Sequence, residues 1–313
     1  MNGTNTWKNI LLLFIPGALW GSSFLLTEIV LESMPPVTFT TVRNLLTAIG
    51  LVGLLYWKNG RLPTAWRSWF DYLLLGLFNT AIPFVLISWG QLYIDSGLAS
   101  ILVSTMPLFT IILAHFFTSS ERITLTKFVG IMLGLVGIVV LIDPSALEGL
   151  GQNMLGQLAV IGAAICYAIG AIHSLRVLQA PRLRALSQQV RAFEVIAGQF
   201  VTTAVFFIPI ALFVDGLPTL PSLRSTLALF GSAWPMTIIA VVVFYYLIDT
   251  VSTTFASLSV YLIPIFGVLF GVLILNEPLT LQIVVALCLI LCGVAIVNGI
   301  FNRSNQLSVA SNQ

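Results

Sequence analysis

Two charged side chains, Glu28 and Arg43, lie inside long apolar runs of the chain, where a charge is costly and usually has a function. Arg43 lies about six residues, or ~9 Å, into the helix expected over 37–56. Glu28 lies near the same end of the preceding helix, so a charge pair that closes this end is one interpretation. The other is that Arg43 recognises an anion or acts as a gate. Glu28 is also the candidate for proton coupling, but no acid lies at mid-depth of a run, so the coupling ion stays open.

Aromatic and amide side chains inside the same runs could recognise an uncharged part of a ligand. A Trp or Tyr ring offers a large apolar face and one hydrogen-bonding atom, which suits an amphipathic metabolite. The amide of Asn79 can both donate and accept, so it could read a carboxylate or an amino group. Each has a structural alternative, such as an interhelical hydrogen bond, close helix packing or anchoring at the membrane interface. The predicted substrate-binding residues are Trp20, Ser23, Asn79, Tyr167, Tyr245 and Tyr261.

Pro107 and Pro264 occupy related places in two of the apolar runs. A proline inside a helix removes a backbone hydrogen bond and kinks the helix, which suits a gate that opens on one side. Static helix bundles also contain such prolines, because neighbouring groups can satisfy the freed carbonyl. A gating role for the two prolines is therefore a prediction with a structural alternative.

No group of residues indicates catalysis or metal binding. Cys166, Cys288 and Cys292 lie in apolar runs without a nearby histidine or acid, which argues against a metal site or a disulfide framework. An intramembrane enzyme would need clustered acids, histidines or a nucleophile with its base at one depth. We predict no catalytic residue, no metal and no cofactor.

The elements that must position these residues are membrane-spanning helices. Hydrophobic residues make up 58% of the 313-residue chain, charged residues 8%, and the mean hydropathy is +1.04. A soluble protein carries about 25% charged residues. The apolar runs are continuous rather than alternating and approach the ~20 residues that a spanning helix needs. The expected spans are 9–30, 37–56, 70–93, 98–117, 126–142, 153–173, 193–213, 227–248, 253–275 and 280–300.

The basic residues indicate how the chain is oriented in the membrane. If the N-terminus lies in the cytoplasm, all thirteen Lys and Arg residues except Arg43 and Arg224 fall on the cytoplasmic side. This predicts a multi-pass protein with both tails, 1–8 and 301–313, in the cytoplasm. A net charge of only +2 gives no indication of nucleic-acid binding.

Residues 99–141 resemble residues 256–297 in order and spacing. A repeat of five helices crosses the membrane an odd number of times, so its second copy is inverted. Inverted repeats are typical of secondary carriers, whose substrate site lies between the halves near the midplane. The sequence thus predicts an all-α integral membrane fold of ten transmembrane helices, as two inverted five-helix repeats, 9–142 and 153–300, around a central cavity. The aligned pairs are Ala99-Ser100 with Ala256-Ser257, Pro107-Leu108-Phe109 with Pro264-Ile265-Phe266, Glu121 with Glu277, and Gly137 with Gly293.

These residues also carry a family resemblance over about residues 9 to 300. The chain resembles the EamA family of the drug/metabolite transporter superfamily. The likeness implies ten helices, a central cavity and export of amino acids or other small metabolites, commonly coupled to the proton gradient, in a bacterial inner membrane. Tyr167-Ala168 departs from the pattern, since it stands where Trp-Gly would be. The matching residues are Trp20-Gly21-Ser22-Ser23-Phe24, Arg43, Ala99-Ser100, Pro107 and Glu121, with Ala256, Pro264 and Glu277 in the second half.

The leading functional hypothesis is a secondary transporter that moves a small metabolite by alternating access, as an exporter of an amino acid or a related compound. A passive channel or facilitator is the alternative, and an intramembrane enzyme is a remote one. The expected partners are the small-molecule substrate and the lipid bilayer. The sequence leaves open the substrate, the direction of flux, coupling to protons and the oligomeric state, including a homodimer.

Overall fold

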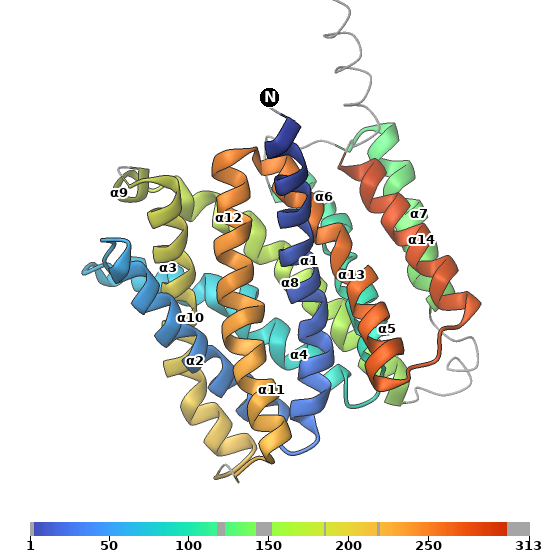
Figure 1. Cartoon of the computed structure of the whole chain (residues 1–313), viewed down its shortest axis with the longest axis horizontal. Coiled ribbons are helices and arrows are strands. Elements are labelled where there is room, and N and C mark those ends of the chain that lie inside the picture. The colour runs from blue at the N-terminus through green and yellow to red at the C-terminus, as the bar shows by residue number, and fades with distance from the viewer. Residues whose placement is uncertain (1–2, 118–122, 142–151, 185, 218–219, 299–313) are drawn as a thin grey trace, which may run out of the picture.

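The computed structural model describes residues 3–117, 123–141, 152–184, 186–217 and 220–298, and these residues form helices and no strand (Figure 1). Glu121 and the predicted tail 301–313 lie outside the described residues. The helices are α1 (Gly3–Leu31), α2 (Pro36–Trp57), α3 (Trp66–Gly76), α4 (Ile82–Gly90), α5 (Ser96–Val103), α6 (Met106–Phe117), α7 (Leu125–Leu141), α8 (Gln152–Leu178), α9 (Pro181–Arg184), α10 (Gln188–Val214), α11 (Leu223–Ala233), α12 (Ala240–Thr250), α13 (Thr253–Leu275) and α14 (Leu281–Val297), with π-helices η1 (Leu77–Ala81) and η3 (Trp234–Ile239).

Each of the ten predicted ranges is helical over most of its described residues, and the short helix α9 was not predicted. Eight continuous helical segments are long and apolar enough to cross a membrane, while α7 and α14 have 17 residues each, the lower limit for a span. Several boundaries differ from the prediction by a turn or more, and α1 begins six residues early, at Gly3. In the second half, α8 continues to Leu178 and α10 begins at Gln188. These extra turns carry Arg176 and Arg191, and a search for apolar runs stops where charges begin.

Large apolar side chains cover the outer surface of the bundle. Phe213 is 91% exposed, and Val139 and Leu273 are each about two-thirds exposed. A soluble protein rarely leaves so much apolar surface in water, whereas lipid tails solvate it well. The chain is therefore a multi-pass membrane protein.

Helices from the first half of the chain pack mainly against helices from the second half: α1 against α13, α2 against α10, α4 against α8 and α7 against α14. The last pair lies side by side at one edge of the bundle (Figure 1). A Cβ atom on Gly293 would lie 2.6 Å from the Gly130 carbonyl oxygen, so only glycine permits this close approach. The two halves are thus joined along their length rather than standing as separate domains.

Three of the predicted spans are interrupted near their middle. The π-helix η1 lies between α3 and α4, and η3 lies between α11 and α12, each with a proline at or just beyond it, Pro83 and Pro235. The third break falls at Ser104 and Thr105, between α5 and α6, directly before Pro107. Proline removes a helical hydrogen bond. A π-helix has i→i+5 hydrogen bonds, so each of its turns contains one residue more than an α-helical turn, and such turns occur frequently at functional sites.

The related prolines Pro107 and Pro264 differ in their local structure. Pro107 follows a break, whereas α13 runs without interruption from Thr253 to Leu275 through Pro264. The two positions therefore share a sequence pattern without sharing a backbone conformation.

Candidate functional site

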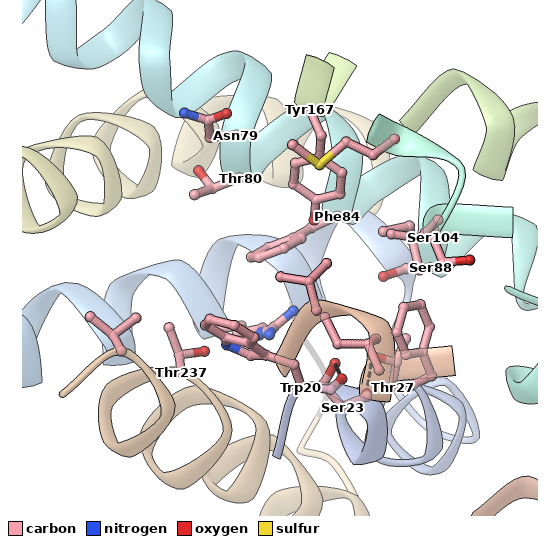
Figure 2. A pocket seen from close by; sticks show the side chains of 18 of the residues that line it. Trp20, Ser23, Thr27, Asn79, Thr80, Phe84, Ser88, Ser104, Tyr167 and Thr237 are labelled. Atoms are coloured by element: carbon pink, nitrogen blue, oxygen red, sulfur yellow. Dashed lines mark hydrogen bonds between the residues drawn. The ribbon is translucent and has the colours of Figure 1, made fainter. Parts of the chain in front are cut away.

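A cavity of about 370 Å³ lies at the centre of the bundle (Figure 2). Both halves of the chain line it, through α1, α2, η1, α4, α5, α6, α8, α10, η3, α12 and α13. Its volume is within the range of cavities that hold small molecules, about 300–1,000 Å³. The lining is largely apolar, with a few polar groups that could orient a ligand.

The interrupted helices supply several of the polar groups of the cavity. Asn79 and Thr80 come from η1, Thr237 from η3 and Ser104 from the break between α5 and α6. Figure 2 shows Asn79 and Thr80 on one side and Trp20, Ser23 and Thr27 on the other, with Phe84 between them.

The hydroxyl groups of this set are satisfied by their own helices. Thr80 donates to the Gly76 carbonyl at 2.7 Å, and Thr237 donates to the Ser232 carbonyl at 3.1 Å, across the wider π-turn. Ser104 donates to the Ile101 carbonyl at 2.6 Å. Each of these hydroxyl groups has one hydrogen, and the bond to the backbone already uses it. The hydroxyl oxygens can therefore only accept hydrogen bonds from a ligand.

Arg43 is the one charged residue among the described residues that line the cavity. Its side chain is 7% exposed, and the guanidinium carbon lies 4.1 Å from the centroid of the Phe84 ring. The phenol of Tyr167 lies within electrostatic reach. Within the described part of the chain, Nε of Arg43 has no hydrogen-bond partner and no carboxylate forms an ion pair with the guanidinium. The cavity therefore contains a buried cation that lies over an aromatic ring and has no ion-pair partner among the described residues.

An amide pair forms a second polar region of the cavity wall. Asn79 Nδ2 donates to Gln199 Oε1 at 3.4 Å and to the hydroxyl of Ser174 at 3.3 Å. Asn79 Oδ1 packs against the backbone of Gly170, where any Cβ atom would overlap it. Gly170 thus sets the position of the Asn79 side chain.

The structure brings together some of the predicted site residues. Trp20, Ser23, Asn79 and Tyr167 line the cavity, as do Arg43 and Pro107. Contact of these residues with a substrate stays a prediction.

Tyr245, Tyr261, Glu28 and Pro264 are not among the described residues that line the cavity. Tyr245 packs against Phe193, with ring centroids 6.2 Å apart. The hydroxyl of Tyr261 donates to the Val294 carbonyl at 3.3 Å and accepts from Asn298 at 2.8 Å, which ties α13 to α14. These two tyrosines therefore contribute to helix packing.

The predicted charge pair between Glu28 and Arg43 is not formed. Both residues are described, and no ion pair joins them, because Arg43 turns into the cavity over Phe84. Glu28 instead lies within electrostatic reach of Glu277 and Asp95, and one of its carboxylate oxygens has no hydrogen-bond partner among the described residues.

Glu277 belongs to a set of polar bonds that joins the two halves at one end of the bundle. Its carboxylate accepts from the backbone N–H groups of Ser96 at 2.8 Å and of Gly97 at 2.9 Å, at the N-terminus of α5. Asp215 accepts from the N–H of Thr38 at 2.7 Å, in the first turn of α2. The partners of Glu277 are about 180 residues away in the chain, so these bonds join the two halves.

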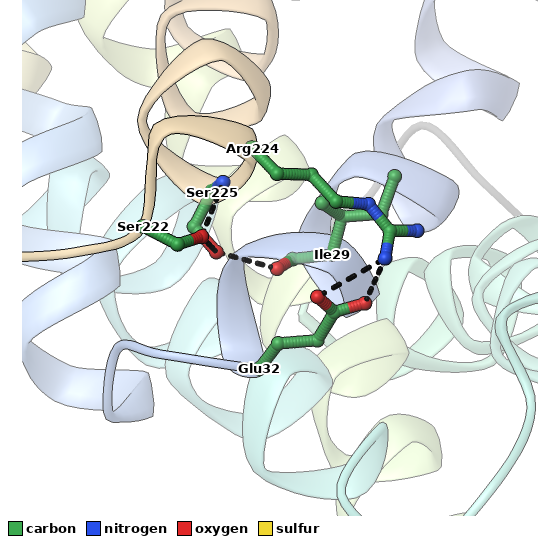
Figure 3. Close-up of polar contacts among 5 residues, drawn as sticks. All are labelled: Ile29, Glu32, Ser222, Arg224 and Ser225. Carbon is green, nitrogen blue, oxygen red and sulfur yellow. Dashed lines mark hydrogen bonds and ion pairs between the residues drawn. The ribbon is translucent and has the colours of Figure 1, made fainter.

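Two further bonds complete this set, which we call the Glu277 seam. Arg224 forms an ion pair with Glu32 at 3.0 Å, and the Ser225 hydroxyl donates to the Ile29 carbonyl at 2.9 Å (Figure 3). The seam is thus defined by the bonds of Glu277, Asp215, Arg224 and Ser225 to the first half of the chain.

Two features escaped the sequence interpretation. Phe84 lies under Arg43, but one phenylalanine among 21 gives no signal of a special role. Glu194 is 1% exposed and accepts from the Tyr72 hydroxyl at 2.8 Å. We had expected this helix to begin at residue 193, which placed Glu194 at its end, whereas α10 begins a full turn earlier.

Comparison with known proteins identifies relatives that match both halves of the chain. The model of the EamA-like transporter family matches residues 7–143 and again residues 154–299. The chain is 30% identical over 276 residues to the "Uncharacterized inner membrane transporter YedA" of Escherichia coli K12, covering 86% of this chain and 83% of that protein. It is 23% identical over 286 residues to the "Uncharacterized transporter YoaV" of Bacillus subtilis 168, covering 91% and 94%.

A solved structure titled "Crystal structure of protein" has a similar fold. It aligns with a TM-score of 0.63 over 93% of this chain and 97% of that one, at 19% identity. At this identity, the likeness concerns the fold alone.

Proposed function

The chain belongs to the EamA-like transporter family, and we propose that it is a secondary transporter, which moves a small metabolite across the membrane by alternating access. The observation that carries this proposal is the central cavity, which residues of both family matches enclose. The relatives that are named as transporters support the same class of function and favour a non-enzymatic role.

The proposed architecture is ten transmembrane helices in two inverted repeats, 9–142 and 153–300. The two family matches support it, since each covers five of the ten predicted helices. The helix contacts also have the symmetry that such a repeat requires: α1 packs against α13, as α8 packs against α5 and α6, while α2 pairs with α10 and α7 with α14. A π-helix interrupts the third predicted span of each half.

We further propose that both termini lie in the cytoplasm, in a cell inner membrane, because this places all but two of the basic residues on the cytoplasmic side. The Glu277 seam then closes the outer end of the bundle. The family resemblance implies export of an amino acid or a related compound and coupling to protons, and the charges in the cavity decide between these two kinds of substrate. Glu28, with its unpartnered oxygen beside Glu277 and Asp95, is the group in the seam that could take up a proton.

Transport is tested with the purified protein in lipid vesicles. A panel of amino acids and small carboxylates is supplied outside, and accumulation is followed with and without an imposed pH gradient. A coupled carrier concentrates its substrate, and the accumulation collapses with a protonophore. Flux that only runs downhill supports the facilitator instead. Flux equal to that of protein-free vesicles for every solute contradicts both.

Alternating access is tested separately at Ser23, which lines the cavity. Ser23→Cys is made in a chain whose three native cysteines are replaced by serine. A membrane-impermeant thiol reagent should label it from one side only, and the preferred side should shift when the transported solute is added. Equal labelling from both sides, regardless of solute, identifies an open channel.

A further inference from the structure

The charge of Arg43 is not balanced within the cavity. A guanidinium is protonated under all ordinary conditions, and burial without a partner is strongly unfavourable. The face of the Phe84 ring attracts the cation, but it accepts no hydrogen bond in the plane of the guanidinium. Within the described residues, Nε of Arg43 has no acceptor and no carboxylate pairs with the guanidinium.

The buried and partly buried glutamates of the described chain have other neighbours. Glu277 binds the N-terminus of α5, Glu194 binds Tyr72, and Glu28 lies with Glu277 and Asp95 in the region of the seam. None of them lines the cavity. The balancing anion must then come from outside the described protein.

We propose that the cavity binds a small organic monoanion, with a carboxylate on Arg43 and an apolar body against the aromatic lining. This inference rests on the proposed transport function, since it names the substrate class of the same cavity. A carboxylate matches the planar, two-pronged donor geometry of a guanidinium. Trp20 and Phe84 offer the apolar faces, and the amide pair of Asn79 and Gln199 lies in the wall where it could read a distal polar group.

Charge balance also separates a monoanion from a zwitterion. With a monoanion bound, the cavity is neutral overall, whereas an amino acid zwitterion leaves one net positive charge in a low-dielectric space. No carboxylate among the described lining residues is available to hold an ammonium group. The volume of about 370 Å³ corresponds to about twelve waters at ~30 Å³ each, so a ligand of roughly that many non-hydrogen atoms fits.

The test compares three ligands with one carbon skeleton on the protein purified in detergent: phenylacetate, its neutral amide phenylacetamide, and its α-amino derivative, the zwitterion phenylglycine. Binding is measured by calorimetry and by the rise in melting temperature. The wild type should bind phenylacetate at least about tenfold more tightly than either of the others. Equal affinities, or no binding of phenylacetate, overturn the proposal.

Variants assign this preference to Arg43. Arg43→Met keeps a chain of similar length without the charge and should remove the preference, while Arg43→Lys should keep part of it. Lys58→Met is the matched control, because it removes an exposed positive charge at the end of the same helix, outside the cavity. A preference for phenylacetate that survives in Arg43→Met overturns the proposal. If Arg43→Met does not fold, Arg43→Lys decides, because an unchanged affinity there also overturns it.

The binding experiment and the transport experiment can contradict their two proposals independently of each other. Binding of phenylacetate through Arg43, without flux of any solute, would contradict the transport function and leave the anion site standing. Accumulation of neutral or cationic solutes by a protein that does not prefer phenylacetate would contradict the anion site and leave the transport function standing.

Discussion

Charged side chains in the Glu277 seam and in the central cavity have opposite surroundings. In the seam, Glu277 and Asp215 each accept hydrogen bonds from backbone N–H groups at the start of a helix from the other half. In the cavity, Arg43 lies under an aromatic ring and has no hydrogen-bonded or ion-paired partner within the described chain. Both regions are parts of the interface between the halves, so the difference is not one of location in the fold.

The difference indicates that the charges of the seam stabilise the fold, whereas the charge of the cavity serves ligand binding. A carboxylate at a helix N-terminus satisfies free N–H groups and the positive end of the helix dipole, so it contributes stability to this conformation. An unpaired buried cation contributes none and is tolerated where a ligand supplies the missing charge. The two kinds of site should therefore respond to charge removal with opposite changes in stability.

The largest effect on stability is expected at the seam. Glu277→Gln keeps the shape of the side chain but removes its charge, and one of its two acceptor oxygens becomes a donor that faces the N–H groups of Ser96 and Gly97. We expect the free energy of unfolding to fall by about 2 kcal/mol, since hydrogen bonds to charged groups contribute about 1.5–3 kcal/mol. Thermal unfolding in detergent measures the change.

Glu32→Gln is the control for Glu277→Gln. Its ion pair with Arg224 belongs to the same seam, but the two side chains are 47% and 60% exposed. Exposed pairs contribute about 0–1 kcal/mol, so this variant should lose clearly less stability. An equal loss in both variants would show that the helix N-terminus does not add to the bond of Glu277.

The next effect is expected in the wall of the cavity, at Gly170. Gly170→Ala should push Asn79 away from its place beside Gln199, because the new methyl group overlaps Asn79 Oδ1. We expect transport to fall about three- to tenfold, as in Asn79→Ala, at normal protein abundance. Gly162→Ala on the same helix is the control, because its methyl group would meet only the Leu86 side chain at 3.5 Å, an ordinary contact. Equal transport in the two glycine variants would remove Asn79 from the site.

The helices of this fold could be predicted from the sequence, because lipid imposes a simple rule on composition and length. Continuous apolar runs located the ten predicted spans, and turn residues separated them, while the short polar helix α9 was missed. The rule says nothing about the charged turns beyond the lipid, which is why the start of α10 and the end of α8 were placed too far inward.

The site could be predicted only in part. Of the predicted substrate-binding residues, Trp20, Ser23, Asn79 and Tyr167 line the cavity, whereas Tyr245 and Tyr261 are not in its lining, and contact of any of them with a substrate stays a prediction. Successive residues of a helix are turned by about 100°, and an apolar run does not reveal which face of its helix is turned toward the cavity. Breaks such as η1 and η3 add a further rotation that hydropathy does not reveal.

A smaller effect, of opposite sign, is expected for Arg43→Met in the absence of ligand. Removing an unpaired buried cation should leave the free energy of unfolding unchanged or raise it by up to about 1 kcal/mol. Melting temperatures of the purified variant and the wild type, measured side by side with Glu277→Gln, give the sign. A loss as large as that of Glu277→Gln would mean that Arg43 has a strong partner inside the protein and would remove the contrast between the two regions.

The smallest effect is expected from a double-mutant cycle between Glu28 and Arg43. Residues that do not touch have additive effects within about 0.3–0.5 kcal/mol, whereas an ion pair in contact couples by about 0.5–3 kcal/mol. Because Arg43 faces the cavity and Glu28 lies with Glu277 and Asp95, Glu28→Gln combined with Arg43→Met should give the sum of the single changes. A coupling above about 1 kcal/mol would mean that the two charges meet in another state of the protein, in which the cavity cation is balanced from within. In that case Arg43 would alternate between Glu28 and the substrate, and the unpaired cation of this structure would be one half of a cycle.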